Sequence, residues 1–267
     1  MKNILEKIIA HKKKEVQRVR ELYPIKLLEE SLYYQSPTIS LSKYLLRPDK
    51  QGIIAEIKRK SPSRGAFKPD VDIEQLSISY MQAGASALSV LTDNKFFGGS
   101  AEDLKIARKF NYCPILRKDF IIDSYQVYEA RSIGADAILL IARILSADKL
   151  KELSRLAVSL GLEVLLELHP GDRYEELDLE YTDLIGVNNR SLSDFKVSLD
   201  HSVNMAESLP KDKVLVSESG IKSASDILKL REAGYSGFLI GEYFMSAPRP
   251  EERCAELITA LMKTAKI

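Results

Sequence analysis

Eight short apolar runs, each as long as a buried β-strand, recur between residues 53 and 240 of this chain. Each run is apolar almost throughout and does not alternate with polar residues. Strands that are buried on both faces have this pattern, which is typical of parallel sheets covered by helices. The runs occupy residues 53–55, 87–91, 114–116, 137–141, 163–166, 184–187, 214–216 and 237–240.

Helical patterns separate these runs, and several end on a glycine that can stop a helix just before the next strand. The clearest patterns cover residues 100–110, 124–133, 146–160 and 223–233, and the glycines are Gly84, Gly134, Gly161 and Gly234.

Eight β–α units in a chain of 267 residues match the size of a (β/α)8 barrel. The alternative is an open doubly wound sheet, which usually carries a glycine-rich fingerprint after its first strand. Here the first strand is followed by Lys-Arg-Lys-Ser-Pro-Ser at residues 58–63. We therefore predict an α/β protein with a single domain over residues 1–267. Its TIM barrel spans residues 51–267, and a helical extension spans residues 1–50.

The extension begins with an amphipathic pattern over residues 3–20, and a second short helix is expected near residues 25–34. The run His-Lys-Lys-Lys at residues 11–14 could form an anion-binding arm. Glutamates at positions 6, 15 and 21 interleave with it, so we predict a solvated helix face instead.

Composition excludes several classes of protein. The 39 basic and 38 acidic side chains leave a net charge of +1, which argues against a nucleic-acid binder. No apolar run approaches the roughly 18 residues of a membrane span. Two cysteines, Cys113 and Cys254, are too few for a disulfide framework, and three scattered histidines make a His-rich metal site improbable. We expect a cytoplasmic protein with no metal, no membrane contact and no nucleic-acid partner.

Polar residues follow five of the predicted strands, where the catalytic groups of such a barrel lie. A charged residue after a strand is usually the start of a solvated loop, but five strands ending in this way favour a site. Glu167 is the clearest case, because a carboxylate set among apolar residues is costly unless it is paired or functional. The residues are Glu56 and Lys58, Lys118, Glu167, Asn188 and Arg190, and Glu218.

The last two predicted strands lead into glycines, at Ser219-Gly220 and Gly241-Glu242. These glycines could serve tight turns alone. Barrels often bind phosphate with the loops after strands seven and eight, through backbone N–H groups. Cations at positions 58, 59, 60 and 64, with Lys118 and Arg190, would make the barrel mouth positive. We therefore predict a small phosphorylated and carboxylated ligand.

Five stretches of the sequence closely resemble the indole-3-glycerol phosphate synthase family. They are residues 54–63, 88–93, 116–121, 186–192 and 217–221. The resemblance implies a monofunctional enzyme of tryptophan biosynthesis that needs no metal or organic cofactor. It would convert 1-(2-carboxyphenylamino)-1-deoxyribulose 5-phosphate to indole-3-glycerol phosphate, with loss of carbon dioxide and water. The implied partners are this phosphorylated small molecule and other enzymes of the same pathway.

The resemblance also implies a role for each matching residue. Lys118 matches the general acid, and Glu167 matches the carboxylate that transfers protons during ring closure and dehydration. Lys58 matches a contact to the substrate carboxylate that also assists dehydration, while Glu56 and Asn188 position the lysines and substrate hydroxyls. The matching substrate-binding residues are Arg190, Ser61, Phe97, Phe120 and Glu218. The matching phosphate-binding residues are Lys60, Ser219, Gly220, Gly241 and Glu242.

Two positions depart from the family pattern. Some relatives carry serine in place of Glu242, so we expect the backbone N–H of Glu242, rather than its carboxylate, to contact phosphate. Arg117 occupies a position that is often apolar, and strand parity turns it away from Lys118, toward the surface or a helix.

The sequence leaves two other functions open. A Schiff-base aldolase could use Lys118, although such an enzyme would not need Glu167 or the pair Glu56 and Lys58. A non-catalytic protein that binds phosphorylated metabolites could use the positive mouth alone.

Overall fold

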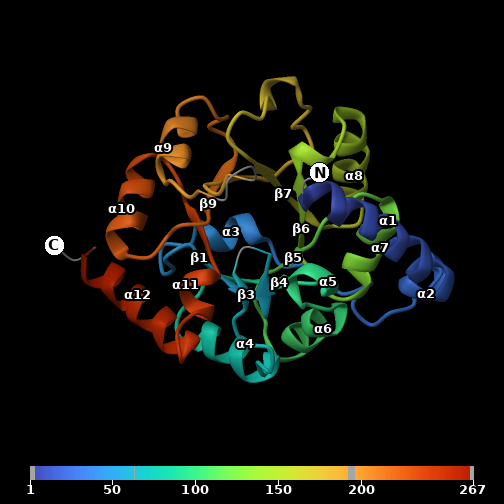
Figure 1. Ribbon diagram of the computed structural model, residues 1–267, viewed down its shortest axis with the longest axis horizontal. Coiled ribbons are helices and arrows are strands. Elements are labelled where there is room, and N and C mark those ends of the chain that lie inside the picture. The colour runs from blue at the N-terminus through green and yellow to red at the C-terminus, as the bar shows by residue number, and fades with distance from the viewer. Residues whose placement is uncertain (1–3, 63, 192–195, 265–267) are drawn as a thin grey trace.

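Eight parallel strands close into a barrel with helices around it (Figure 1). The computed structural model describes residues 4–62, 64–191 and 196–264; Ser63 and Leu192, which belong to two of the characteristic stretches, lie outside them. The strands neighbour one another in the order β1-β10-β9-β8-β7-β6-β5-β4. They are β1 (Ile53–Ile57), β4 (Ala87–Leu91), β5 (Ile115–Lys118), β6 (Ala137–Ile141), β7 (Glu163–Leu168), β8 (Leu184–Asn188), β9 (Val214–Glu218) and β10 (Gly237–Ile240). The predicted TIM barrel is confirmed.

Helices connect the strands where the sequence predicts them, with one exception. Residues 169–183, all of them described, connect β7 to β8 without an α-helix. Their one helical element is the 3-10 turn η2 (Tyr174–Glu176). The long connecting helices are α4 (Ile73–Gln82), α6 (Ala101–Phe110), α7 (Ser124–Ser132), α8 (Ala147–Ser159), α9 (Asp200–Ala206), α10 (Ala224–Glu232) and α12 (Pro250–Thr264). The short elements are β2 (Lys60–Ser61), β3 (Gly65–Ala66), α5 (Asn94–Phe97), η1 (Ala142–Ile144) and α11 (Glu242–Met245).

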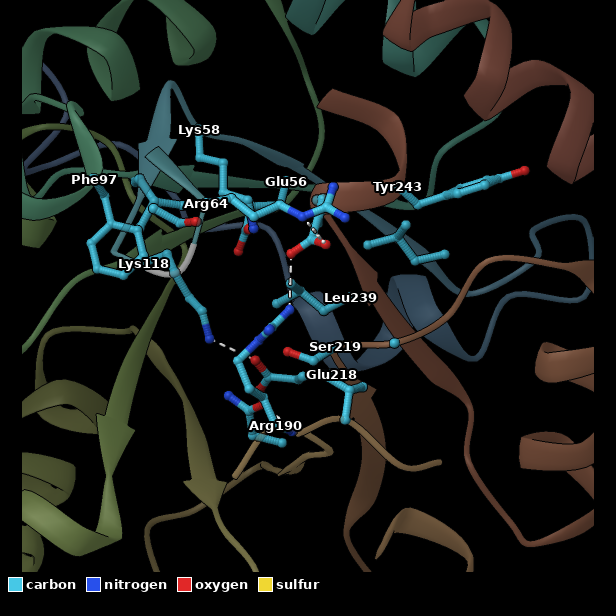
Figure 2. A pocket seen from close by; sticks show the side chains of 18 of the residues that line it. Glu56, Lys58, Arg64, Phe97, Lys118, Arg190, Glu218, Ser219, Leu239 and Tyr243 are labelled. Carbon is cyan, nitrogen blue, oxygen red and sulfur yellow. Dashed lines mark hydrogen bonds and ion pairs between the residues drawn. The ribbon is translucent and has the colours of Figure 1, made fainter. Parts of the chain in front are cut away.

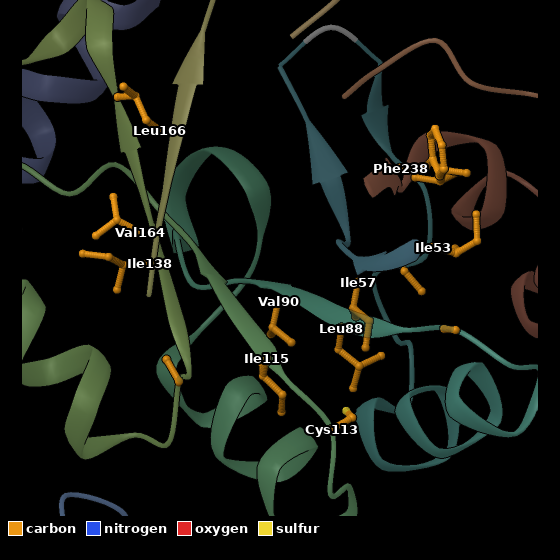
Figure 3. Close-up of a cluster of buried hydrophobic side chains, with 14 of the residues drawn as sticks. Ile53, Ile57, Leu88, Val90, Cys113, Ile115, Ile138, Val164, Leu166 and Phe238 are labelled. Carbon is orange, nitrogen blue, oxygen red and sulfur yellow. The ribbon is translucent and has the colours of Figure 1, made fainter. Parts of the chain in front are cut away.

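Alternate residues of each strand belong to different cores. One core lies between the barrel and its helices and contains residues such as Ile53, Leu88 and Val164 (Figure 3). The other fills the barrel interior with Ile54, Leu116, Leu139, Leu165, Val216 and Leu239. Because side chains alternate along a strand, the residue two positions after an interior apolar residue also faces inward. This parity directs the polar residues that end the strands into the barrel mouth.

A short helix of the extension closes the opposite end of the barrel. Leu41 and Leu45 of α3 (Leu41–Leu45) are buried within the interior core. Ser40 caps α3, and the hydroxyl groups of Ser40 and Ser42 donate to the Glu163 carboxylate at the start of β7. The bottom of the barrel is thus sealed by apolar side chains, so the cavity opens at the mouth.

The rest of the extension forms α1 (Ile4–Leu22) and α2 (Ile25–Glu29). The first helix agrees with the predicted one, whereas the second is shorter than residues 25–34. Both contact α7, and α1 runs from beside the mouth to the rim of the molecule (Figure 1). The solvated face predicted for the lysine run is correct for Lys13 and Lys14, which are exposed, and wrong for Lys12, which is fully buried.

Candidate active site

A cavity of about 780 Å³ opens among the C-terminal ends of the strands. Fourteen of the fifteen residues of the predicted site line it, and the polar ones come from six different strands or the loops that follow them. Lys60 is the exception, because its side chain lies along Gly98 and away from the cavity. Strand parity turns these side chains into the mouth, and closure of the barrel brings together groups that the sequence separates by as much as a hundred residues or more.

Lys118 stands between two buried carboxylates. Its Nζ lies 2.7 Å from Oε2 of Glu167 on β7 and 2.6 Å from Oε2 of Glu218 on β9. Figure 2 shows Lys118 directed across the cavity toward Glu218. One ammonium and two carboxyl groups in direct contact can pass protons among themselves and to a bound molecule.

The charges of these three groups move their pKa values apart. Burial alone would raise the pKa of Glu167, but the nearby Lys118 and His169 hold that pKa at about 2. Burial, joined by the charge of Glu167, raises the pKa of Glu218 to about 8 in spite of Lys118. The pKa of Lys118 is raised, because its two carboxylate neighbours outweigh burial. The two glutamates therefore titrate as a coupled pair around one ammonium, with Glu167 the more acidic and Glu218 the less acidic of the two.

A second ion pair lies across the mouth on β1 and its following loop. Nζ of Lys58 lies 2.8 Å from Oε1 of Glu56. Gly241 makes room for this carboxylate, because a Cβ atom there would lie 2.2 Å from Oε1 of Glu56. Gly186 does the same for Glu218, whose Oε1 would lie 2.4 Å from a Cβ atom at that position. Both glycines are therefore needed for close approach and not for backbone flexibility.

Aromatic and apolar side chains form another wall of the cavity. The rings of Phe97 and Phe120 lie 5.9 Å apart between centroids, at 39°, and both line the cavity. Ile4, Leu5 and Ile8 of α1 also line it. A flat apolar ligand can bury against such a wall while its polar substituents reach the opposite side. The sequence did not identify the contribution of α1, because the residues of a helix outside the barrel carry no strand-parity signal.

The predicted phosphate-binding loops are adjacent and strained at one point. β9 pairs with β10, which brings the loops after them together. Ser219 has φ of 67°, the single left-handed non-glycine backbone among the described residues, and Gly220 follows with φ of 86°. The side-chain amide of buried Asn189 donates to the Ser219 carbonyl and holds this turn. Strain that is held in place in this way is a common feature of ligand sites.

The Glu242 side chain contacts cations at this place. Its two carboxylate oxygens lie 3.2 Å from Nε of Arg64 and 2.9 Å from Nη2 of Arg190. Two guanidinium groups beside two glycine-containing loops form an anion-binding surface that a phosphate could share with the carboxylate. Arg64 was noted in the sequence only as part of a charged run, since the loop that carries it gives no periodicity.

Two further buried side chains complete the surroundings of the site. The guanidinium of Arg117 points outward from β5 to Glu129 of α7, as parity predicts, and is buried rather than at the surface. His169 lines the cavity, with Nε2 3.3 Å from Oε1 of Glu167, and burial lowers the pKa of its imidazole. The sequence interpretation passed over His169, although its position two residues after Glu167 on the same face could have identified it.

Within the described ranges, no group of three or more His, Cys, Asp or Glu side chains is arranged to hold a metal ion. No helix in the described part of the chain is both long and apolar enough to cross a membrane.

The closed parallel barrel, with an ammonium between buried carboxyl groups at its mouth, is that of a (β/α)8-barrel enzyme whose mouth holds groups able to transfer protons. Residues 5–257 match the family described as indole-3-glycerol phosphate synthase. The chain belongs to the indole-3-glycerol phosphate synthase family.

Close relatives carry the same name. The chain is 47% identical to the indole-3-glycerol phosphate synthase of Bacteroides thetaiotaomicron, over 98% of this chain and 100% of the relative. It is 42% identical to that of Polaromonas sp., over 96% of this chain and 98% of the relative.

Solved structures of low sequence identity share the fold alone. A mutant tryptophan synthase alpha-subunit from Pyrococcus furiosus superposes with a TM-score of 0.60 at 14% identity, over 80% of this chain and 99% of that one. The 3-hexulose-6-phosphate synthase of Salmonella typhimurium gives 0.62 at 13% identity, over 79% and 99%.

Proposed function

We propose that this chain closes the indole ring of its substrate, 1-(2-carboxyphenylamino)-1-deoxyribulose 5-phosphate, and releases carbon dioxide and water. The observation that carries this proposal is the contact of the Lys118 ammonium with Glu167 and Glu218, in a cavity that Phe97 and Phe120 also line. The product is indole-3-glycerol phosphate, as the family name states.

The first step needs an acid. The aromatic carbon that bears the carboxylate attacks the ribulose carbonyl, and Lys118 gives a proton to the carbonyl oxygen, which becomes a hydroxyl group. Loss of carbon dioxide from the same carbon then restores the aromatic ring. The raised pKa of Lys118 keeps it in the ammonium form that this step requires.

The second step removes water. The nitrogen lone pair, acting through the ring, expels the new hydroxyl group, which leaves as water after Lys58 protonates it. Glu167 takes the proton from the neighbouring carbon, and the indole double bond forms. Its lowered pKa leaves Glu167 ionised and able to accept that proton. Glu56 positions Lys58 by their ion pair.

Substrate binding divides among three surfaces. The aromatic ring packs between Phe97, Phe120 and the apolar residues of α1. Arg190, whose backbone N–H donates to Oδ1 of Asn188 at 3.0 Å, lies at the edge of the phosphate loops and holds the carboxylate of the substrate, while Arg64 is the cation left for the phosphate. The phosphate binds at the turn of Ser219 and Gly220 and at the Gly241 loop, through the backbone N–H groups of these loops.

A Schiff-base mechanism is less compatible with the site. Nucleophilic attack by a lysine needs the neutral amine, whose population rises when the pKa is lowered. Both carboxylate neighbours of Lys118 raise its pKa instead. Borohydride added in the presence of substrate should therefore trap no adduct on Lys118.

Turnover of the carboxyphenylamino substrate by the purified chain tests the proposal directly. The absorbance and fluorescence of the indole product should appear together with one carbon dioxide per product molecule. Absence of turnover by a folded wild-type protein would overturn the assignment.

The cellular setting belongs to the same proposal. Cys113 and Cys254 are both free and buried, as expected in a reducing compartment, and we infer a cytoplasmic location on this basis. We infer that its partner enzymes include the one that consumes indole-3-glycerol phosphate in the same pathway.

A further inference from the structure

Lys12 of α1 is fully buried, although it belongs to an exposed run of lysines. Its Nζ lies 2.9 Å from Oδ1 of Asp119, 3.1 Å from Oδ2 of Asp93 and 2.8 Å from Oε1 of Glu15. Asp93 and Asp119 are themselves buried and follow strands β4 and β5. A side chain outside the barrel therefore supplies a charge to the rim of its mouth.

Each of these aspartates holds one phenylalanine of the aromatic wall. Oδ1 of Asp93 caps α5 by accepting from the backbone N–H of Phe96 and of Phe97, at 2.7 and 3.2 Å. Oδ1 of Asp119 accepts from the backbone N–H of Phe120 at 2.8 Å. The two aspartates among the carboxylates that Lys12 contacts are thus the groups that set the backbone positions of both rings.

These carboxylates depend on Lys12 to different degrees. Asp119 also receives hydrogen bonds from Thr92 and Arg117. Oδ2 of Asp93 accepts no hydrogen bond within the described residues, so the ammonium 3.1 Å away is its compensating charge. An uncompensated buried carboxylate either takes up a proton or moves toward water. Movement of Asp93 would release the cap of α5 and displace Phe97.

We propose that Lys12 is a positioning residue for the aromatic wall: by neutralising Asp93 and Asp119 it fixes Phe97 and Phe120 and so sets the affinity for the aromatic half of the substrate. This inference rests on the proposed function. It also explains the placement of α1, since Ile8 lies one turn before Lys12 and lines the cavity. The N-terminal extension therefore contributes residues to the binding site.

The test separates the two halves of the substrate. The dissociation constants of 2-aminobenzoate and of inorganic phosphate are measured by NMR titration of the full chain. Lys12→Met removes the charge and keeps the length of the side chain. Lys13→Met is the matched control, because it removes the same charge from the exposed neighbour on the same helix.

We expect Lys12→Met to weaken 2-aminobenzoate binding by about tenfold and to leave phosphate binding unchanged. KM for the substrate should rise more than kcat falls. Asp93→Asn added to Lys12→Met should restore the affinity, because the amide oxygen keeps the cap of α5 without a charge to neutralise. That double variant also carries the test if the single variant does not fold.

Several results would overturn the inference. Equal losses for both ligands would indicate a general defect, and no loss for 2-aminobenzoate would show that the rings do not depend on Lys12. A tenfold loss of 2-aminobenzoate affinity that persists in the double variant would show that Lys12 does not act through Asp93. Normal wild-type turnover with an unaffected Lys12→Met variant refutes this inference alone, whereas a wild-type chain without turnover contradicts the proposed function.

Discussion

Replacement of Lys118 by methionine removes the ammonium from between two buried carboxyl groups while it preserves most of the side-chain volume. We expect kcat to fall by about 10²–10⁴-fold, the range for loss of a general acid, which corresponds to roughly 3–5 kcal/mol in the barrier. The assay is product fluorescence under saturating substrate. A variant that retains more than half of the wild-type kcat would refute the assignment of Lys118 as the acid.

The same variant should also be less stable, by an amount that depends on pH. Lys118 holds the pKa of Glu167 at about 2, against an ordinary value of 4.5. A lowered pKa in the folded state contributes stability above the unfolded pKa, and this contribution is lost as pH falls toward the folded pKa. The shift corresponds to on the order of 3 kcal/mol at pH 7, similar to the cost of breaking a buried ion pair.

Urea denaturation at pH 7 and at pH 4 measures this effect. The difference in unfolding free energy between wild type and Lys118→Met should be largest at pH 7 and should shrink at pH 4, where the unfolded carboxyl is increasingly protonated. Lys105→Met is the control, because Lys105 is a surface residue whose partner lies 3.7 Å away, and it should change stability by less than about 0.5 kcal/mol. A pH-independent difference would contradict the electrostatic reasoning.

Glu167→Gln keeps the shape of the side chain but cannot accept a proton, so kcat should fall by about 10²-fold or more while KM changes little; equal turnover would refute its role. The pKa of Glu218 at about 8 predicts a transition of kcat/KM near that pH, which should be absent in Glu218→Gln. Gly241→Val should displace Glu56, whose Oε1 lies where the new Cβ would be, and raise KM strongly. Glu242→Ser frees two arginines from a competing carboxylate, so KM should stay the same or fall, and an increase would argue against a phosphate beside Glu242. Sulfate should compete with substrate, and a sulfate-bound structure without an anion between the loops after β9 and β10 would contradict the phosphate site.

The sequence by itself determined the barrel and the faces of its strands. Runs such as residues 137–141 are apolar throughout because both faces of a barrel strand are buried, and this signal is local. Once a residue is placed on a strand, the period of two decides its direction. Glu56, Lys118 and Glu167 could therefore be assigned to the mouth without coordinates, and Arg117 to the outer side of the barrel, at the surface or against a helix.

Tertiary structure alone decided which of these groups touch. From the sequence, Lys118 could pair with any of the glutamates at the mouth. Only closure of the barrel places its ammonium between Glu167 and Glu218. Lys12 has the same local sequence signature as the exposed Lys13, since a helical pattern records polarity but not the charge of the surface that a helix will meet. Burial of a charge depends on a partner distant in the chain, here Asp93 and Asp119, and that dependence is a property of the folded molecule.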